Sequence, residues 1–207
     1  DLHLMHRIKN AGCKSKEDVV FTIKKIIDDI LAESTSLTLI GGDVSSEFSI
    51  FELFVKMLRK LAGSGRRTFV FVLGNHELWN FPGLSVDEIV DKYRTVLKEN
   101  GMYLLHNDLF YRNESDDMGI IPYDELIQSD NPAILEKLRC TRLVILGGLG
   151  FSGYNEEFNA NDGVYRATVD RNTEIQESKK FEQLYDKLTD VLAKKNTVIF
   201  THTPKKD

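Results

Sequence analysis

The sequence predicts an α/β domain in which helices cover a mixed or divided β-sheet. Segments with apolar residues at helical spacing alternate with short β-branched and aromatic runs, which is the pattern of buried strands covered by helices. Three of these runs end directly in a cluster of polar residues. Two short strand-like runs lie close together in the middle of the chain, and they favour a mixed or two-sheet arrangement over a purely parallel sheet.

In the first half of the chain, helices and strands are expected to alternate. Ser15 and Asp18 have the spacing of a capping box, and apolar residues at helical spacing follow them as far as Leu31. The run from Thr68 to Leu73 is β-branched and aromatic throughout, as in a buried strand. The predicted segments are a helix over 15–31, a strand over 37–40, a helix over 48–61, a strand over 68–73 and a helix over 85–100.

The second half is less regular. Two short strands are expected to form a hairpin joined at Asn107 and Asp108, and the polar stretch 114–138 has only a weak helical pattern. The remaining predicted segments are strands over 103–105 and 109–112, a strand over 143–146, a long loop over 147–165, a helix over 172–195 and a strand over 197–200.

Composition limits the classes of protein to consider. The 207 residues are 42% hydrophobic and 29% charged, which is ordinary for one globular domain. The net charge of -5 gives no basic field for a dedicated nucleic-acid surface, although bound cations could still attract a small phosphorylated substrate. No run approaches the ~20 apolar residues of a membrane span, so no membrane partner is expected. Cys13 and Cys140 are expected to be free core thiols in a reducing compartment, which predicts a cytoplasmic location.

Both ends of the chain are expected to be truncated. The sequence opens on Asp1 without a methionine and stops at Asp207. Residues 1–207 are therefore interpreted as a single domain that lacks its first strand and a segment at its C-terminal end.

The three polar clusters follow predicted strands, and the carboxyl ends of strands in an α/β sheet are where ligands bind. The clusters are therefore expected to converge, and Asp1 and His3 fit the same rule if a strand precedes them. The candidate site residues are Asp1, His3, Asp43, Asn75, His76 and His202.

Carboxylates, imidazoles and an amide oxygen without thiolates suit divalent first-row metals, above all manganese, with iron or zinc as alternatives. Side chains two apart in an extended segment share a face, so Asp1 and His3 could bind one ion. Taken singly, a Gly-Asp or Asp-x-His pair is more often a turn or cap, and only the joint occurrence favours a metal site. His6 and His106 are expected to be structural. Glu77 could be a metal ligand, but a hydrogen bond from a histidine of the site to its carboxylate is the favoured expectation.

The ordered set Asp1-Leu2-His3, Gly42-Asp43, Gly74-Asn75-His76-Glu77 and Thr201-His202 resembles the calcineurin-like metallophosphoesterase family over nearly the whole chain. The resemblance implies a four-layer fold, a two-sheet mixed β sandwich flanked by helices, with a dinuclear metal centre. Asp1 and His3 would bind one ion, Asp43 would bridge both, and Asn75 and His202 would bind the other. His76 would be the catalytic residue beside the substrate.

Two positions depart from the family pattern. The family usually has Asp at Glu77, and its Gly-His-x-His motif does not follow His202. The implied function is hydrolysis of phosphate esters by a metal-activated hydroxide, with phosphodiesterase slightly ahead of phosphomonoesterase. A nuclease and a non-catalytic scaffold of the same fold are the alternatives. Tyr154 and Asn155 are candidates for the substrate wall, and the sequence leaves the oligomeric state open.

Overall fold

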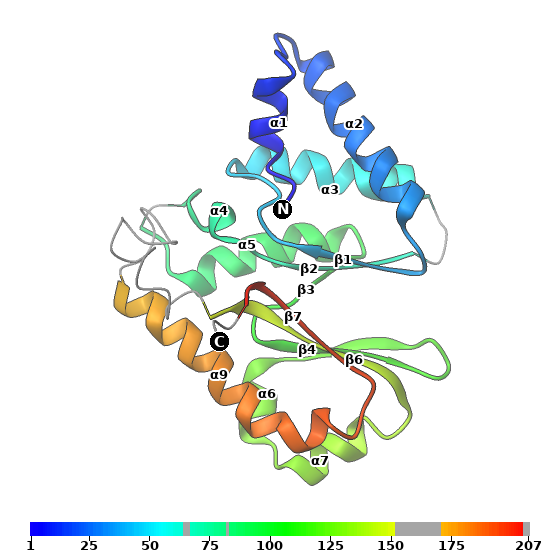
Figure 1. Ribbon diagram of the computed structural model, residues 1–207, viewed down its shortest axis with the longest axis vertical. Helices are drawn as coiled ribbons and strands as arrows, with labels where there is room; N and C mark the ends of the chain where they lie inside the picture. The colour runs from blue at the N-terminus through cyan, green and yellow to red at the C-terminus, as the bar shows by residue number, and fades with distance from the viewer. Residues whose placement is uncertain (64–66, 82, 152–170, 205–207) are drawn as a thin grey trace. The chain divides into compact units, whose positions relative to one another are not determined.

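The computed structural model describes residues 1–63, 67–81, 83–151 and 171–204. The described chain divides into two compact units, unit 1 over residues 1–104 and unit 2 from residue 105 onward (Figure 1). Each unit contains one β-sheet with its own helices, which confirms the predicted α/β class with two sheets. Within the described ranges, no helix is both long enough and apolar enough to cross a bilayer.

Unit 1 contains a parallel sheet in the order β1-β2-β3. Its strands are β1 (Leu37–Gly41), β2 (Thr68–Val72) and β3 (Tyr103–Leu104). Gly41, the last residue of β1, pairs with Val72, the last residue of β2. The two strands therefore end at the same level, and the loops that follow them begin side by side at one edge of the sheet.

Three helices of unit 1 begin and end close to the predicted positions, and the two short helices α1 (Leu4–Asn10) and α4 (Asn75–Leu78) were not predicted. The Oγ atom of Ser15 accepts a hydrogen bond from the Asp18 N–H at 3.1 Å, so the predicted capping box is present. Helix α1 contains His6 and has only seven residues. The helices are α1 (Leu4–Asn10), α2 (Lys16–Glu33), α3 (Phe48–Ala62), α4 (Asn75–Leu78) and α5 (Val86–Glu99).

The core of unit 1 is rich in aromatic side chains. Full burial of one aromatic side chain contributes on the order of 1.5–3 kcal/mol to the free energy of folding, relative to leaving it exposed. The expectation that both cysteines are core thiols is wrong. Cys13 is half-buried against the Thr22 hydroxyl, and Cys140 of unit 2 is exposed. The fully buried aromatic residues of unit 1 are Phe51, Phe54, Phe69, Phe71 and Tyr93.

Unit 2 contains a mixed sheet in the order β5-β4-β6-β7. Its strands are β4 (Asp108–Asn113), β5 (Met118–Ile121), β6 (Thr141–Gly150) and β7 (Thr197–Thr203). The pairs of β4 with β5 and β6 are antiparallel, and the pair of β6 with β7 is parallel. Helix α9 (Arg171–Leu192) packs on this sheet, together with α6 (Tyr123–Gln128) and α7 (Asn131–Lys137), through buried aliphatic residues and Phe181 (Figure 1).

The predicted hairpin at Asn107 and Asp108 is wrong. Strand β3 pairs in parallel with β2, and the hairpin partner of β4 is β5, a strand that the sequence pattern did not reveal. The Asp108 carboxylate accepts the backbone N–H groups of His106 and Tyr123. Asn107 and Asp108 are thus buried at the start of β4, whereas a two-residue hairpin turn would lie at the surface.

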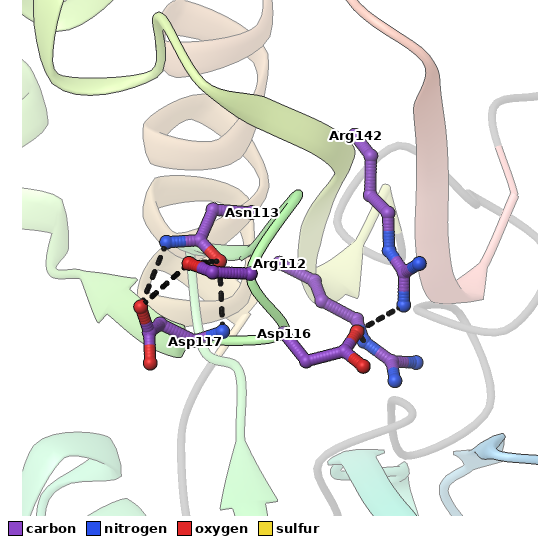
Figure 2. A network of polar contacts seen from close by, with 6 residues as sticks. Arg112, Asn113, Asp116, Asp117 and Arg142 are labelled. Atoms are coloured by element: carbon purple, nitrogen blue, oxygen red, sulfur yellow. Dashed lines mark hydrogen bonds and ion pairs between the residues drawn. The ribbon is translucent and has the colours of Figure 1, made fainter.

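A polar network fixes the β4–β5 turn (Figure 2). Asp116 has a left-handed backbone at φ 68°. Its Oδ1 atom accepts a hydrogen bond from Arg112 Nε at 2.9 Å and another from Arg142. Strand pairing shifts at Arg112 and Asn113, which places Arg142 at a β-bulge. The network joins the turn to β6, and its half-exposed ion pairs each contribute about 1 kcal/mol or less.

A buried ion pair joins α9 to the segment before β4. His106 Nε2 lies 3.2 Å from Glu177 Oε2, and Lys180 donates to the other oxygen of the same carboxylate at 2.7 Å. Burial raises the pKa of Glu177, but the hydrogen bonds and charges of His106 and Lys180 outweigh burial and hold that pKa below its ordinary value. His106 is therefore structural, as predicted.

Replacing Glu177 with glutamine is expected to destabilise the chain at neutral pH by about 1–3 kcal/mol, because buried hydrogen bonds to a charged group are lost. A carboxylate with a lowered pKa stabilises the fold above its unfolded-state pKa, and this contribution disappears as the pH falls through the folded-state pKa. The difference in melting temperature between wild type and E177Q should therefore shrink below about pH 4.5. The exposed Glu136, paired with Arg139, provides the control variant E136Q, for which little difference is expected at either pH.

Candidate functional site

The loop that follows β1 places Asp43 at the centre of the candidate site. The residue is 4% exposed and has a left-handed backbone at φ 49°, after Gly42 at φ 82°. A residue other than glycine rarely adopts this backbone conformation, so surrounding contacts must hold Asp43 in place. Those contacts come from the first residues of the chain and from the loop after β2.

The Asp43 carboxylate lies between two imidazole rings. Its Oδ1 atom accepts the backbone N–H of His76 at 3.0 Å. Its Oδ2 atom lies 3.7 Å from His3 Nε2 and 3.8 Å from His76 Nε2. The structure therefore brings together three of the predicted residues, which come from three separate segments of the chain.

The first four residues lie against the loop that contains Asp43. The backbone N–H groups of Leu2 and His3 both donate to the Asp43 carbonyl, at 3.0 and 2.8 Å, and the Leu4 N–H donates to Val44. His3 has a positive φ of 45° immediately before α1. A carboxylate oxygen of Asp1 lies within 4.8 Å of one of Asp43. Asp1 and His3 are thus held beside Asp43, as the sequence predicted.

Glu77 fixes both loops through its carboxylate. Its Oε2 atom accepts the N–H groups of Asp43 and Gly74 at 2.9 and 2.8 Å, and its Oε1 atom accepts the Ser45 N–H at 2.9 Å. The side chain is fully buried, and this burial raises its pKa. The expectation that Glu77 contacts a histidine is wrong, because its partners are backbone N–H groups of the two loops.

Gly74 is required where the two loops meet. A Cβ atom at this position would overlap Asp43 Oδ1 and would lie 2.5 Å from the Asp43 nitrogen. Real Cβ atoms essentially never approach other atoms this closely. The absence of a side chain at Gly74 therefore allows the Asp43 carboxylate to reach its position.

The donor atoms fit a divalent cation. Ligating atoms of His3, Asp43 and His76 all lie within 4.8 Å of one another. The Nδ1 atom of His3 is buried and has no hydrogen-bond partner within the described part of the chain. Imidazole nitrogens with carboxylate oxygens form a mixed set that suits manganese, iron or zinc. These residues could hold a cation.

Residues 1–206 match the family model of the calcineurin-like phosphoesterases. The chain belongs to this family. No curated protein and no solved structure gives a significant match to the chain. Membership confirms the predicted fold class, and it supports metal-dependent hydrolysis of phosphate esters as the general activity. It leaves the substrate undefined.

The other predicted site residues of this chain have different outcomes. Asn75 is the half-buried first residue of α4. His202 is half-buried within β7 of unit 2, whereas the sequence placed it after the strand. Tyr154 and Asn155 lie outside the described residues. The roles of all four stay predictions.

A groove of about 420 Å³ runs along β1 in unit 1 and ends at Asp1 and Leu2. The Ser36 carbonyl accepts the Thr68 N–H, so the backbone groups of residue 36 face β2. In a parallel pair the facing residues alternate, so Leu37 and Leu39 direct their backbone N–H and C=O groups toward the opposite edge of β1. The single-domain prediction with a missing first strand stays a prediction.

Two residues near the site were missed by the sequence analysis. The ring centroid of Trp79 lies 4.0 Å from that of His76, and the Asn80 side chain contacts three separate segments of unit 1. The only available signal was their position directly after the Gly-Asn-His-Glu cluster. Their spacing alone predicts no chemistry.

Proposed function

We propose that this chain is a phosphoesterase with a dinuclear metal centre, acting on a small phosphorylated substrate, with phosphodiesters ahead of phosphomonoesters. The observation that supports the proposal is the convergence of His3, Asp43 and His76 from three segments onto one position, which places two predicted metal ligands beside the predicted catalytic histidine. A reducing, cytoplasmic location is part of the proposal and rests on the sequence argument from cysteine usage.

In this proposal, Asp1 and His3 hold one cation, Asp43 is shared, and the second cation is held by Asn75 and His202. Manganese is the first candidate, with iron or zinc as alternatives. When bound, two such cations polarise a phosphoryl oxygen and make water a stronger nucleophile at neutral pH. The carboxylates must be ionised and the imidazoles neutral to bind them, so activity should fall at acid pH.

The protein's own groups would then orient and protonate the substrate. His76 is half-buried, and its Nε2 atom faces the Asp43 carboxylate. At this position an imidazole can stabilise phosphoryl oxygens and donate a proton to the leaving oxygen. The Glu77 carboxylate binds the N–H groups of Asp43 and Gly74 and so holds the loops after β1 and β2 together. The metal-binding atoms are therefore in position before the substrate binds.

The test is the hydrolysis of a generic aryl phosphate monoester and diester in the presence of Mn²⁺. The proposal predicts turnover of at least one ester that EDTA abolishes, with the diester preferred. Turnover that resists EDTA would show that the metal assignment is wrong. Cation binding without turnover of either ester would favour the non-catalytic scaffold, and cleavage of nucleic acid alone would favour the nuclease.

A further inference from the structure

The His76 imidazole lies between two other aromatic rings of unit 1. The Trp79 ring is tilted by 31° relative to it, with ring centroids 4.0 Å apart, and the His3 ring meets it at a steep 72° with centroids 4.7 Å apart. Offset-stacked and edge-on contacts at such separations are attractive. Both contacts restrict rotation of the His76 side chain.

The backbone of His76 is held by a second set of contacts. Asn80 Nδ2 donates toward the carbonyls of His76 and Glu77 at 3.4 and 3.3 Å, and toward Tyr93 Oη at 3.1 Å. Asn80 Oδ1 accepts the Phe48 N–H at 2.7 Å, at the start of α3. The fully buried Tyr93 donates its hydroxyl to the Glu77 carbonyl at 2.9 Å.

These contacts compensate for the shortness of α4. A helix of four residues cannot hold its own shape. Of the His76 and Glu77 carbonyls, the first accepts the Trp79 N–H at a long 3.4 Å. Asn80 and Tyr93 supply donors to those carbonyls, and they connect the turn to α3 and α5. The backbone orientation at His76 is thereby set by the core of unit 1.

We propose that a clamp fixes the orientation of the His76 ring over the site. The clamp consists of Trp79, Asn80 and Tyr93. All three are positioning residues, because they act through His76. The inference rests on the proposed function, in which His76 meets the phosphoryl group.

The expected consequence is a defect in turnover with little change in substrate or metal binding. Misplacing a proton-transferring group by about 1 Å can reduce a rate about a hundredfold. The Trp79 ring contacts the His76 ring, and Asn80 bonds to the carbonyls of α4. The loop that contains Asp43 is held by other bonds, from the Asp43 N–H to Glu77 and from the N–H groups of residues 2 and 3 to the Asp43 carbonyl. Loss of the clamp should therefore lower kcat and leave KM and the Mn²⁺ requirement nearly unchanged.

The experiment compares W79L with W79F, and adds N80D. W79F keeps a flat ring, whereas W79L does not. N80D keeps an acceptor for the Phe48 N–H and loses the donors to α4. We expect W79L and N80D to lower kcat about tenfold to a hundredfold, with KM within about twofold, and W79F to restore most of the rate. Melting curves of each variant establish that it is folded.

A second measurement does not depend on turnover. Stacking on Trp79 should displace the ring C–H resonances of His76 in NMR spectra, with the assignment made by their loss in H76Q. The displacement should persist in W79F and disappear in W79L. If the wild type hydrolyses no ester, the proposed function fails, and this resonance alone decides whether the clamp orients His76.

Two results would overturn the inference. One is an unchanged His76 resonance in W79L together with an unchanged kcat. The other is a raised Mn²⁺ requirement in W79L at constant kcat, which would identify His76 as a metal ligand.

Discussion

Replacing Asp43 with asparagine is expected to reduce Mn²⁺-dependent hydrolysis at least about a thousandfold. Asp43 is the only predicted residue assigned to both cations, and its carboxylate contacts the His76 backbone and faces both imidazoles. An amide in its place removes the negative charge that two cations would share. Loss of the cations would remove several kcal/mol of transition-state stabilisation. A change of about 1.4 kcal/mol in the barrier corresponds to a tenfold change in rate.

The control for this prediction is D28N. Asp28 is a half-exposed residue of α2 whose ion pair with Lys24 is local, so its loss should leave both rate and stability nearly unchanged. Initial rates at saturating Mn²⁺, with melting curves for both variants, provide the comparison. A D43N variant that retains more than about a tenth of the wild-type rate would contradict the assigned role of Asp43, since that is a change of no more than 1.4 kcal/mol.

Replacing Glu77 with alanine is expected to destabilise unit 1 by roughly 3–6 kcal/mol. The substitution leaves the N–H groups of Asp43, Ser45 and Gly74 without their acceptor at buried positions. Each unsatisfied buried donor costs about 1–3 kcal/mol. The left-handed backbone at Asp43 would lose its main support at the same time. Denaturant unfolding at neutral pH measures the change.

The matched control is E88A, which removes another glutamate that accepts a backbone N–H. Glu88 lies at the exposed start of α5, where it completes the capping box with Ser85. Its loss should destabilise the chain far less than the loss of Glu77, because water can replace the carboxylate there. Equal destabilisation by E77A and E88A would show that the buried carboxylate does not hold the two loops together.

Much of the fold could be predicted from the sequence, because local patterns decide most of its elements. The helices α2 and α5 have an apolar face and a capping box, and α3 has an apolar face and ends at Gly63. The strands β1 and β2 are short apolar runs closed by glycine. Pairing could not be predicted in the same way. Strand β5 and the partners of β3 and β4 depend on contacts between distant residues, which no local pattern specifies.

The candidate site, like the fold, could be predicted only in part from the sequence. The residue types of Asp43 and His76, each following a strand, were sufficient to predict that they converge. The contacts that hold them were not predictable, because Glu77 binds backbone N–H groups and Trp79 acts through ring packing. Such contacts depend on the three-dimensional path of the loops, and a sequence pattern of polar residues does not encode which backbone groups they meet.

The most direct test of a metal-dependent phosphoesterase is to strip the chain with a chelator and titrate Mn²⁺ back while recording hydrolysis of an aryl phosphodiester. The prediction is that there is no turnover before addition, that the rate rises to saturation with Mn²⁺, and that D43N shows no such rise. A stripped chain that hydrolyses the ester at its full rate, or a D43N variant with the same Mn²⁺ response as wild type, would contradict it.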